Sequence, residues 1–475
     1  MKRLAVYFHY DARGRIDQPC RLAVQSMRPF AQLLFVTNGA LGPEERAWVE
    51  GTGAELLERE NTGFDVGAYR DALLHCGQET VCGFDELVLM NFTLAGPVSG
   101  GRDEPLRRMF ETMAKRPELD FWGLTRHYAM RSRRFGGRVP EHLQSHFLTV
   151  RGRLLRDPAF WDYWRQMRLP RSYEESVTCH ETRFTEYFAE KGFRWDSYVQ
   201  TDDLRQVFLN PIMACPRELI EKRGCPFFKR RSFFTPYADE LRRTDGTASR
   251  ELYEYLCRET AYPVEALLAS LLQDYPLADL ACNLPWHYIL APGEKSGAPD
   301  LAGRGLRLLR FAPLPCEGAA AWYLEQSAAE ADKHLAAAAA LFEKNPRLGL
   351  LCPAWPSWPP SGRACAERWR AVYPGLAEEE KVPAGLTPPK APVAGWALVR
   401  EAALHGADLD LQSGDCCWRL TLRAQKNGFY SAVFETAAHA AARAEQLWAY
   451  QAASEAPFAV AKQLGRLVKH KLERR

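Results

Sequence analysis

The first half of the chain alternates short apolar runs with amphipathic segments of helical length. The apolar runs are rich in β-forming residues and predict strands over residues 4–9, 32–37, 54–58, 87–90 and 121–124. Strands that alternate with helices favour an α/β domain built on a mostly parallel sheet. Such sheets bind ligands beyond the carboxyl ends of their strands, so the residues that follow these runs are the first candidates for a functional site.

The pattern changes near residue 283. Ala291–Gly305 is rich in glycine, proline and small residues, which indicates a linker or a long loop. Ala328–Phe342 and Gly414–Lys426 have helical patterns, whereas the prolines of Pro353–Ser361 predict a loop. We therefore expect a first domain over residues 1–283, a second, smaller α/β module over 284–460 and a basic tail over 461–475.

Composition and charge narrow the class of protein. The chain has 475 residues, of which 47% are hydrophobic and 25% charged, as in ordinary globular proteins. A net charge of +3 argues against a protein that mainly coats nucleic acid. No stretch has the roughly 18 apolar residues of a membrane span. The first ten residues lack the cleavage site of a secretory signal, and the 13 cysteines include no C-x-x-C pair, so we expect a cytoplasmic protein with reduced thiols.

The segment Asn61–Asp71 follows one expected strand and opens an expected helix. Gly63 and Gly67 permit a ligand to approach the backbone closely, and a helix N-terminus favours phosphate. Asp65 is a candidate acceptor of hydrogen bonds from a ribose or a base. The alternative is an ordinary strand-to-helix turn that uses glycine for its tight geometry.

Polar residues also follow the apolar run at 87–90. Asn91 and Thr93 stand where sheet topology places a ligand, and they have the oxygen atoms that hard divalent cations prefer. Phe92 between them has no such atom. A strand that simply ends in a polar turn explains the same residues.

Three further segments are candidates for binding or catalysis. Arg126–Arg138 has five arginines and no acid, which predicts a flexible basic loop that neutralises a diphosphate or is merely solvated. His142 and His146 have no third zinc ligand nearby, so we reject a zinc site. His142 and Gln144 remain candidates for binding sugar hydroxyls. The alternative for His142 is a histidine that is simply buried in the core. Cys225–Phe234 interleaves basic and aromatic residues, as in a phosphate contact, a nucleic-acid surface or a packed turn.

The segment Tyr173–Phe193 holds four glutamates that are candidates for a general base. Transfer of a group to a hydroxyl requires a base that accepts the hydroxyl proton, and a carboxylate can serve. Composition does not choose among Glu174, Glu175, Glu181 and Glu186.

Six of these segments follow one another in a characteristic order: Glu60–Leu74, Phe84–Pro97, Asp120–Thr125, His142–Leu155, His180–Trp195 and Asn210–Phe234. Together they resemble the rhamnan synthesis protein F family, a group of bacterial glycosyltransferases that build rhamnose-containing cell-surface polysaccharides. The resemblance implies a GT-A-like fold, a nucleoside-diphosphate sugar donor, with dTDP-rhamnose suspected, and a growing glycan or lipid-linked acceptor.

The resemblance also implies roles for individual residues. Glu181 matches a family glutamate and is our candidate base. The donor-binding candidates are Asn61, Gly63, Asp65, Gly67, Arg70, Asn91 and Thr93. The candidates for acceptor or phosphate contacts are His142, Gln144, Ser145 and Lys229, to which the basic segment adds Arg126. Phe92 stands where the family has an acid, which leaves open whether Mg²⁺ or Mn²⁺ takes part.

The second half contains weakened versions of blocks found in a second module of the family: Leu341–Pro356, Val393–Leu404 and Arg423–Glu435. This resemblance implies a degenerate glycosyltransferase-like unit. We expect a glycosyltransferase, with rhamnose as the suspected sugar. The alternative is a non-catalytic scaffold that binds glycan or nucleotide in a polysaccharide assembly complex. The tail at 461–475 alternates apolar and basic residues, a pattern that suits peripheral contact with the inner surface of the membrane. The alternative is a terminus that is simply solvated.

Overall fold

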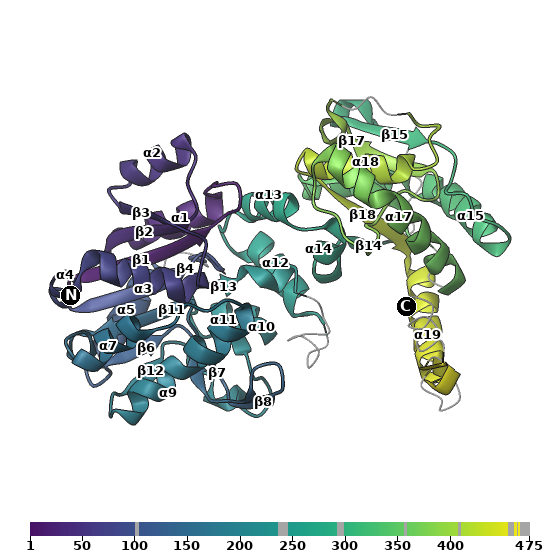
Figure 1. Ribbon diagram of the computed structural model, residues 1–475. Helices are drawn as coiled ribbons and strands as arrows, with labels where there is room; N and C mark the ends of the chain where they lie inside the picture. The colour runs from purple at the N-terminus through teal and green to yellow at the C-terminus, as the bar shows by residue number, and fades with distance from the viewer. Residues whose placement is uncertain are drawn as a thin grey trace. The chain divides into compact units, whose positions relative to one another are not determined.

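The computed structural model describes residues 1–99, 104–235, 246–291, 299–355, 359–406, 410–454, 460–462 and 464–465. They form two compact units (Figure 1). The first consists of Met1–Ser270 and Cys282–Leu284, and the second of Leu271–Ala281 and Pro285–Arg475. Each unit is α/β with its own mostly parallel sheet, which confirms the expected fold class. The chain passes between the units more than once close to residue 283, where the sequence pattern changes. Residues 271–281 belong to the second unit, and residues 282–284 belong to the first.

The sheet of the first unit has seven strands in the order β12-β6-β11-β4-β1-β2-β3. Their bounds are β1 (Arg3–Tyr10), β2 (Gln32–Asn38), β3 (Glu55–Arg59), β4 (Glu86–Asn91), β6 (Phe121–Gly123), β11 (Phe147–Arg151) and β12 (Trp195–Ser197). All neighbouring strands are parallel except β11, which runs antiparallel between β4 and β6. The five strands expected from the apolar runs are all present, each within one residue of its expected ends.

Helices pack against this sheet and close its core. The longer ones are α1 (Gln18–Met27), α2 (Pro43–Gly51), α3 (Phe64–Cys76), α5 (Pro105–Ala114), α7 (Pro158–Gln166) and α9 (Thr182–Glu190), with short turns at α4 (Gln78–Cys82), α6 (Gly152–Leu155) and α8 (Tyr173–Ser176). Leu34 and Leu89 of the strands are buried in one cluster with Trp161 and Phe188 of α7 and α9. Fully burying such a side chain contributes about 1.5–3 kcal/mol, so this cluster holds α3, α7 and α9 on the sheet.

The segment expected to be a flexible basic loop instead forms short strands, so that expectation is wrong. β8 (Met130–Ser132) pairs with β9 (Gly137–Val139), and β7 (Arg126–His127) pairs with β10 (His142–Leu143). The acids that neutralise its arginines come from other segments: Arg134 bonds to Glu174 and Arg138 lies 3.5 Å from Glu186. Sequence proximity alone therefore misses the partners of these charges.

The rest of the first unit packs on the strand ends. Its elements are β5 (Leu94–Ala95), α10 (Pro211–Ala214), α11 (Pro216–Glu221), β13 (Phe228–Lys229) and α12 (Ala248–Glu259). β13 pairs with β5, which follows β4 directly in the chain. This pairing brings Lys229 close to the end of β4.

The second unit has a five-stranded sheet in the order β14-β18-β16-β17-β15. The strands are β14 (His287–Leu290), β15 (Leu306–Arg310), β16 (Leu348–Pro353), β17 (Trp396–Arg400) and β18 (Tyr430–Thr436), and only β17 runs antiparallel to its neighbours. The helices are α15 (Ala319–Lys333), α16 (Leu335–Lys344), α17 (Pro359–Glu380), α18 (Cys416–Lys426) and α19 (Ala437–Ser454). α13 (Val264–Asp274) and α14 (Leu277–Asn283) cross between the units.

Two details of the second unit differ from the expected pattern. The helical segment at 328–342 is divided between α15 and α16 at His334. The proline-rich segment ends in α17, which begins at Pro359 because proline is tolerated in the first turn of a helix. The helix expected at 414–426 is confirmed as α18. Inside this unit, the buried amide of Gln425 donates to the carbonyls of Leu272 and Tyr275 at 2.9 and 3.0 Å.

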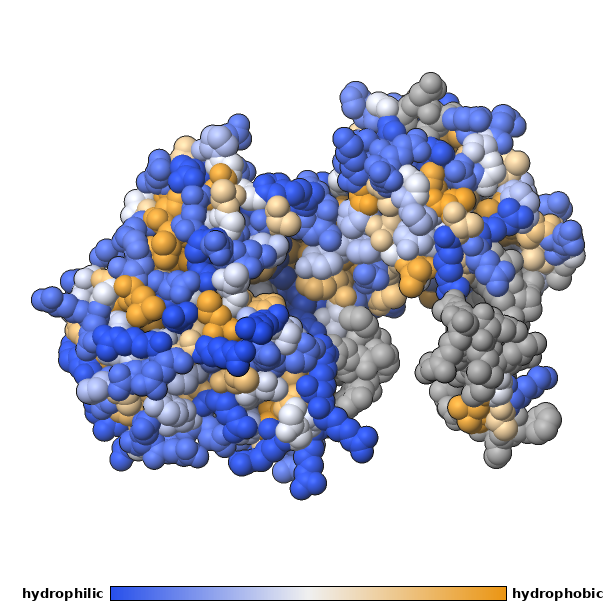
Figure 2. All heavy atoms as spheres, viewed as in Figure 1, coloured by the Kyte–Doolittle hydropathy of each residue, from blue (hydrophilic) through white to orange (hydrophobic). Residues whose placement is uncertain are grey.

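Hydrophilic residues cover most of the face shown in Figure 2, with apolar patches scattered among them. Of the helices that the structure describes, none is long and apolar enough to cross a membrane. All 13 cysteines are free thiols. Most of the basic tail at 461–475 lies outside the described residues.

Candidate functional site

Four segments of the first unit meet at the carboxyl end of β4. β4 ends at Asn91, and the antiparallel β11 begins at the same edge, so Ser145 and His146 lie directly before it. The backbone amide of Asn91 donates to the carbonyl of His146 at 3.2 Å. The first turn of α3, with Asp65, lies here, and the π-helical turn Val177–Glu181 ends here. The topology therefore places these side chains at the edge where parallel sheets bind ligands.

A chain of hydrogen bonds joins these segments. Asn91 Nδ2 donates to Asp65 Oδ2 at 3.0 Å, and Thr93 Oγ1 donates to Asn91 Oδ1 at 2.5 Å. Ser145 Oγ lies 2.8 Å from Asp65 Oδ2 and 2.7 Å from Glu181 Oε2. A hydroxyl has one proton to donate, so both contacts of Ser145 are hydrogen bonds only if one of the two carboxyl groups is protonated.

The surroundings of the two carboxyl groups differ and set where that proton is held. Burial and the nearby charge of Glu181 raise the pKa of Asp65. Burial also acts to raise the pKa of Glu181, but a hydrogen bond from His142, its charge and the charge of Lys229 outweigh this effect and lower that pKa. Asp65 therefore holds a shared proton more readily than Glu181, which stays ionised.

His142 lies beside Glu181 on β10. Its Nδ1 is 2.8 Å from the carbonyl of Pro140, and its Nε2 is 3.6 Å from Glu181 Oε1. Both ring nitrogens thus face oxygen acceptors. The ring stacks on His127 with centroids 5.2 Å apart, and burial together with the charge of His142 lowers the pKa of His127 to about 4. His127 is therefore neutral near pH 7.

Local helix geometry positions Glu181. The turn Val177–Glu181 is π-helical and joins α8 to α9. A π-helical turn holds one residue more than an α-helical turn, and such turns are frequent at functional sites. The side chain of Glu181 keeps 22% of its surface exposed, so a ligand can reach its carboxylate.

Lys229 brings a positive charge to the two carboxyl groups. It pairs with Leu94 across the β13–β5 ladder, and the next residue donates its backbone amide to the carbonyl of Thr93 at 2.9 Å. The charge of Lys229 acts to lower the pKa of both Asp65 and Glu181. The sequence candidates Asp65, Asn91, Thr93, His142, Ser145, Glu181 and Lys229 thus form one cluster.

Asn61 follows β3 and bonds to the end of β2. Its Oδ1 accepts from Asn38 Nδ2 at 3.0 Å, and Arg59 Nη1 donates to Asn38 Oδ1 at 2.6 Å. Arg59 also forms an ion pair with Asp71 at 2.6 Å. Arg59 therefore fixes the segment that leads into α3, a role that sequence reasoning missed.

Gly63 and Gly67 hold the first turn of α3 against a leucine. Gly63 has a φ of +71°, and a Cβ there would lie 2.7 Å from Leu169 Cδ2. A Cβ on Gly67 would lie 3.1 Å from the same atom. Close packing inside the protein thus accounts for both glycines.

Arg70 on α3 has a buried Nε with no hydrogen-bond partner among the described residues.

Two other candidates lie outside the cluster. Gln144 is buried and accepts from Thr125 Oγ1 at 3.0 Å. Arg126 is buried and forms ion pairs with Asp196 and, at 3.0 Å, with Glu141. Its charge is therefore neutralised by protein carboxylates.

Tyr69 is a further residue of the cluster that sequence reasoning missed. It lies one helical turn after Asp65 on α3, and its buried hydroxyl donates to the carbonyl of Ser145 at 3.0 Å. The spacing of four residues from Asp65 is the signal that could have found it.

The end of β4 does not fit a divalent cation held by the protein. The ring of Phe92 packs on Phe8 and His9, with centroids 5.8 and 6.0 Å apart, where an acid would have supplied a ligand. Asn91 uses its amide on Asp65 and its oxygen on Thr93. Across the ranges that the structure describes, no three His, Cys, Asp or Glu side chains are grouped to hold a metal ion.

Comparison with known proteins identifies relatives of this chain. The family model described as rhamnan synthesis protein F matches residues 33–294. A Sinorhizobium fredii protein, y4gN, described as uncharacterized, is 22% identical over 209 residues, which cover 44% of this chain and 51% of that relative. The chain thus spans about half the length of the curated relative that it matches.

Three solved structures illustrate the similarity in three dimensions. Glucosyl-3-phosphoglycerate synthase of Mycobacterium tuberculosis is 10% identical with a TM-score of 0.21, covering 32% of this chain and 57% of that one. Core-mannan synthase A of Aspergillus fumigatus, in its Mn/GDP form, is 8% identical with a TM-score of 0.21, covering 41% and 72%. Mouse xyloside xylosyltransferase 1 is 10% identical with a TM-score of 0.23, covering 39% and 82%. These scores are too low to support a conclusion about this chain.

Proposed function

Because the chain belongs to the rhamnan synthesis protein F family, we propose that it is a glycosyltransferase that adds sugar to a growing cell-surface polysaccharide. One observation carries the proposal. Asp65, Ser145, Glu181 and Lys229 form a carboxylate and lysine cluster at the ligand-binding edge of the sheet, within the segment that matches the family. The donor is a nucleoside-diphosphate sugar, and dTDP-rhamnose is our first candidate.

The donor binds at the edge of the sheet where the end of β4 meets the start of α3. The N-terminus of the 13-residue α3 and the ammonium of Lys229 attract the diphosphate. Asp65 and Asn61 are the proposed acceptors of hydrogen bonds from the ribose or the base. The reacting sugar then lies beside Ser145 and Glu181.

Transfer proceeds by direct displacement at the anomeric carbon. The acceptor oxygen forms a bond to that carbon while the bond from the carbon to the phosphate oxygen breaks, and the nucleoside diphosphate leaves with the electron pair. Glu181 is ionised and accepts the proton of the acceptor hydroxyl. Ser145 and His142 hold its carboxylate in place, and Lys229 stabilises the leaving diphosphate.

A non-catalytic scaffold is the second candidate function. Phe92 removes the acid that the family has at the strand end, and the lowered pKa of Glu181 weakens this group as a base. Such a protein would bind the same donor without turning it over.

Donor binding and turnover separate the two candidates. The full chain is incubated with dTDP-rhamnose, UDP-glucose or GDP-mannose, with and without Mn²⁺, and its melting temperature and the release of nucleoside diphosphate are measured. A ligand that binds only the folded state raises the melting temperature. We expect stabilisation and release with one of these donors. Stabilisation without release or transfer to any glycan acceptor would favour the scaffold.

We further propose that the protein works at the cytoplasmic surface of the membrane, where lipid-linked acceptors are exposed. The motivation is the basic, amphipathic pattern of residues 461–475. Sedimentation with anionic liposomes should recover the full chain but not a chain that ends at Ala461. Equal recovery of both chains would end this proposal.

A further inference from the structure

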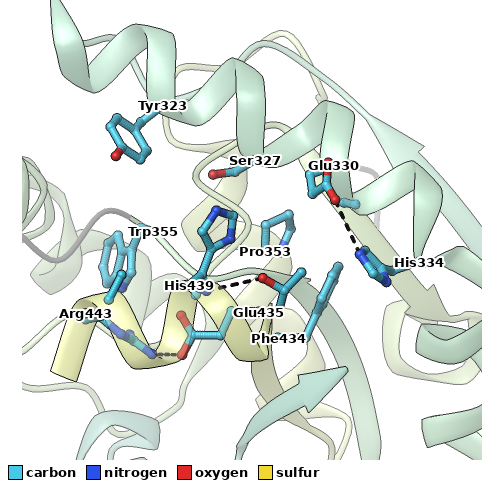
Figure 3. A pocket seen from close by; sticks show the side chains of 14 residues that line it. Tyr323, Ser327, Glu330, His334, Pro353, Trp355, Phe434, Glu435, His439 and Arg443 are labelled. Carbon is cyan, nitrogen blue, oxygen red and sulfur yellow. Dashed lines mark hydrogen bonds and ion pairs between the residues drawn. The ribbon is translucent and has the colours of Figure 1, made fainter. Parts of the chain in front are cut away.

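The second unit has a pocket of its own at the carboxyl ends of its parallel strands. β16 ends at Pro353 and β18 ends at Thr436, and both residues line the pocket (Figure 3). α15 covers one side and the first turns of α19 the other. The pocket thus occupies the position in its sheet at which α/β units bind ligands.

One face of α15 is directed into this pocket. Tyr323, Ser327 and Glu330 follow one another at spacings of four and three residues, which align them along one side of a helix. His334 at the end of α15 borders the pocket and lies 3.5 Å from Glu330 Oε1 through its Nε2. Its buried Nδ1 has no partner in the described part of the chain.

The opposite wall combines an aromatic ring with polar groups. Trp355 follows β16, and Figure 3 shows it across the pocket from Tyr323. Glu435 forms ion pairs with Arg443 and, at 2.7 Å, with His287. The arrangement offers flat apolar surfaces beside fixed carboxylates, the combination that suits a ring with one apolar face and several hydroxyl groups.

The charges of the lining disfavour a phosphate ligand. Glu330 and Glu435 contribute two carboxylates against the single guanidinium of Arg443, which is already paired with Glu435. The pKa of Glu330 is lowered by hydrogen bonds and charges from Lys333 and His334, although burial acts weakly in the opposite direction, so this group stays ionised. A nucleoside diphosphate would meet two carboxylates and a guanidinium that is already paired, whereas a neutral sugar needs no cationic partner.

An exposed aromatic pair extends the surface beyond the pocket. Trp322 is 56% exposed and Tyr323 is 41% exposed, and their rings meet edge to face with centroids 5.2 Å apart. Exposed aromatic residues at the rim of a pocket are typical of a binding surface. The ligand therefore extends over more than one sugar ring.

We propose that the second unit binds a neutral segment of a glycan chain in this pocket, separately from the transfer site of the first unit. The rings of Tyr323 and Trp355 stack on the sugar faces, and Glu330 and Glu435 accept hydrogen bonds from the hydroxyl groups. The choice of glycan rests on the proposed function, but the binding itself does not need transfer to occur.

Saturation-transfer NMR on the full chain tests the proposal. The probes are a linear rhamnose tetrasaccharide and maltotetraose, with dTDP as an anionic comparison. We expect a neutral tetrasaccharide to bind, and Tyr323→Ala and Trp355→Ala each to weaken its affinity about tenfold. Tyr323 is exposed, so its variant tests the ring without disturbing the core.

Two control variants show whether a loss of binding comes from this pocket. Leu386→Ala removes an exposed apolar side chain of the same unit that does not line the pocket, and should leave binding unchanged. In the Glu181→Gln background, Tyr323→Ala should still weaken tetrasaccharide binding about tenfold whether or not transfer is lost, which separates this proposal from the proposed function. The inference is overturned if neither tetrasaccharide binds, if the two pocket variants bind as wild type, or if Trp355→Ala removes dTDP binding instead.

Discussion

Replacement of Glu181 by glutamine tests the proposed chemistry most directly. The substitution keeps the size of the side chain and an oxygen that can accept from Ser145 Oγ, now 2.7 Å from the carboxylate. It removes the negative charge next to His142 and replaces the proposed base with an amide that cannot accept the proton of an acceptor hydroxyl. The site therefore keeps its shape and loses its base.

The size of the effect follows from the role of the group. General bases contribute about 10²- to 10⁴-fold to a rate. Each tenfold loss corresponds to about 1.36 kcal/mol, so the barrier should rise by about 3–5 kcal/mol. Donor affinity should change little, because the proposed diphosphate contacts are Lys229 and the start of α3. The pKa of Asp65 should fall, since the charge of Glu181 is one of the causes that raise it.

The assay follows release of nucleoside diphosphate at saturating donor and acceptor, with donor affinity measured separately. Glu186→Gln is the matched control: Glu186 is on α9, its side chain is also 22% exposed, and it forms an ion pair with Arg183 at 2.6 Å. This control should turn over as wild type. Wild-type turnover in Glu181→Gln, or an equal loss in Glu186→Gln, would refute the assignment of the base.

Three further outcomes are expected. Ser145→Ala removes the hydroxyl that bonds to the carboxyl groups of Asp65 and Glu181, and should lower the free energy of unfolding by about 1–3 kcal/mol. Urea denaturation measures this change, and an unchanged midpoint of the urea curve would contradict the hydrogen-bond arrangement. The pKa of Glu181 is lowered on folding, so its ionised form stabilises the protein fully above the ordinary pKa of 4.5, and this stabilisation is lost as the pH falls below that value. Glu181→Gln should therefore make the melting temperature fall less steeply towards acid pH. Parallel plots of melting temperature against pH for the variant and the wild type would argue against this. Turnover should survive excess EDTA, because Phe92 stands where the family resemblance implies an acid that could bind a metal; a loss that Mn²⁺ restores would contradict this prediction.

Much of the first unit follows from its sequence because apolar runs report burial directly. The runs at 32–37 and 87–90 are strands buried on both faces, and the polar residues after β4 are at its carboxyl end as expected. The pattern does not encode strand direction. β11 runs against its neighbours, and this reversal brings Ser145 to Asp65, 80 residues earlier in the chain.

The remaining features of the site depend on contacts between distant residues. Arg126 belongs to a segment without acids, yet the structure pairs it with Asp196, 70 residues later. The π-helical turn that positions Glu181 covers only five residues, a stretch too short for a periodicity to be read from the sequence. The resemblance to the family located Glu181, and only the fold shows that Ser145 and His142 hold it.

The exchange of short segments between the two units affects how such chains can be recombined. The buried amide of Gln425 in the second unit is held by the carbonyls of Leu272 and Tyr275, which precede the apparent boundary at residue 283. A fusion that joined a foreign module at this boundary would separate α18 from the carbonyls that its glutamine needs. An engineered swap should therefore keep Leu271–Ala281 with the second half rather than cut the chain at residue 283.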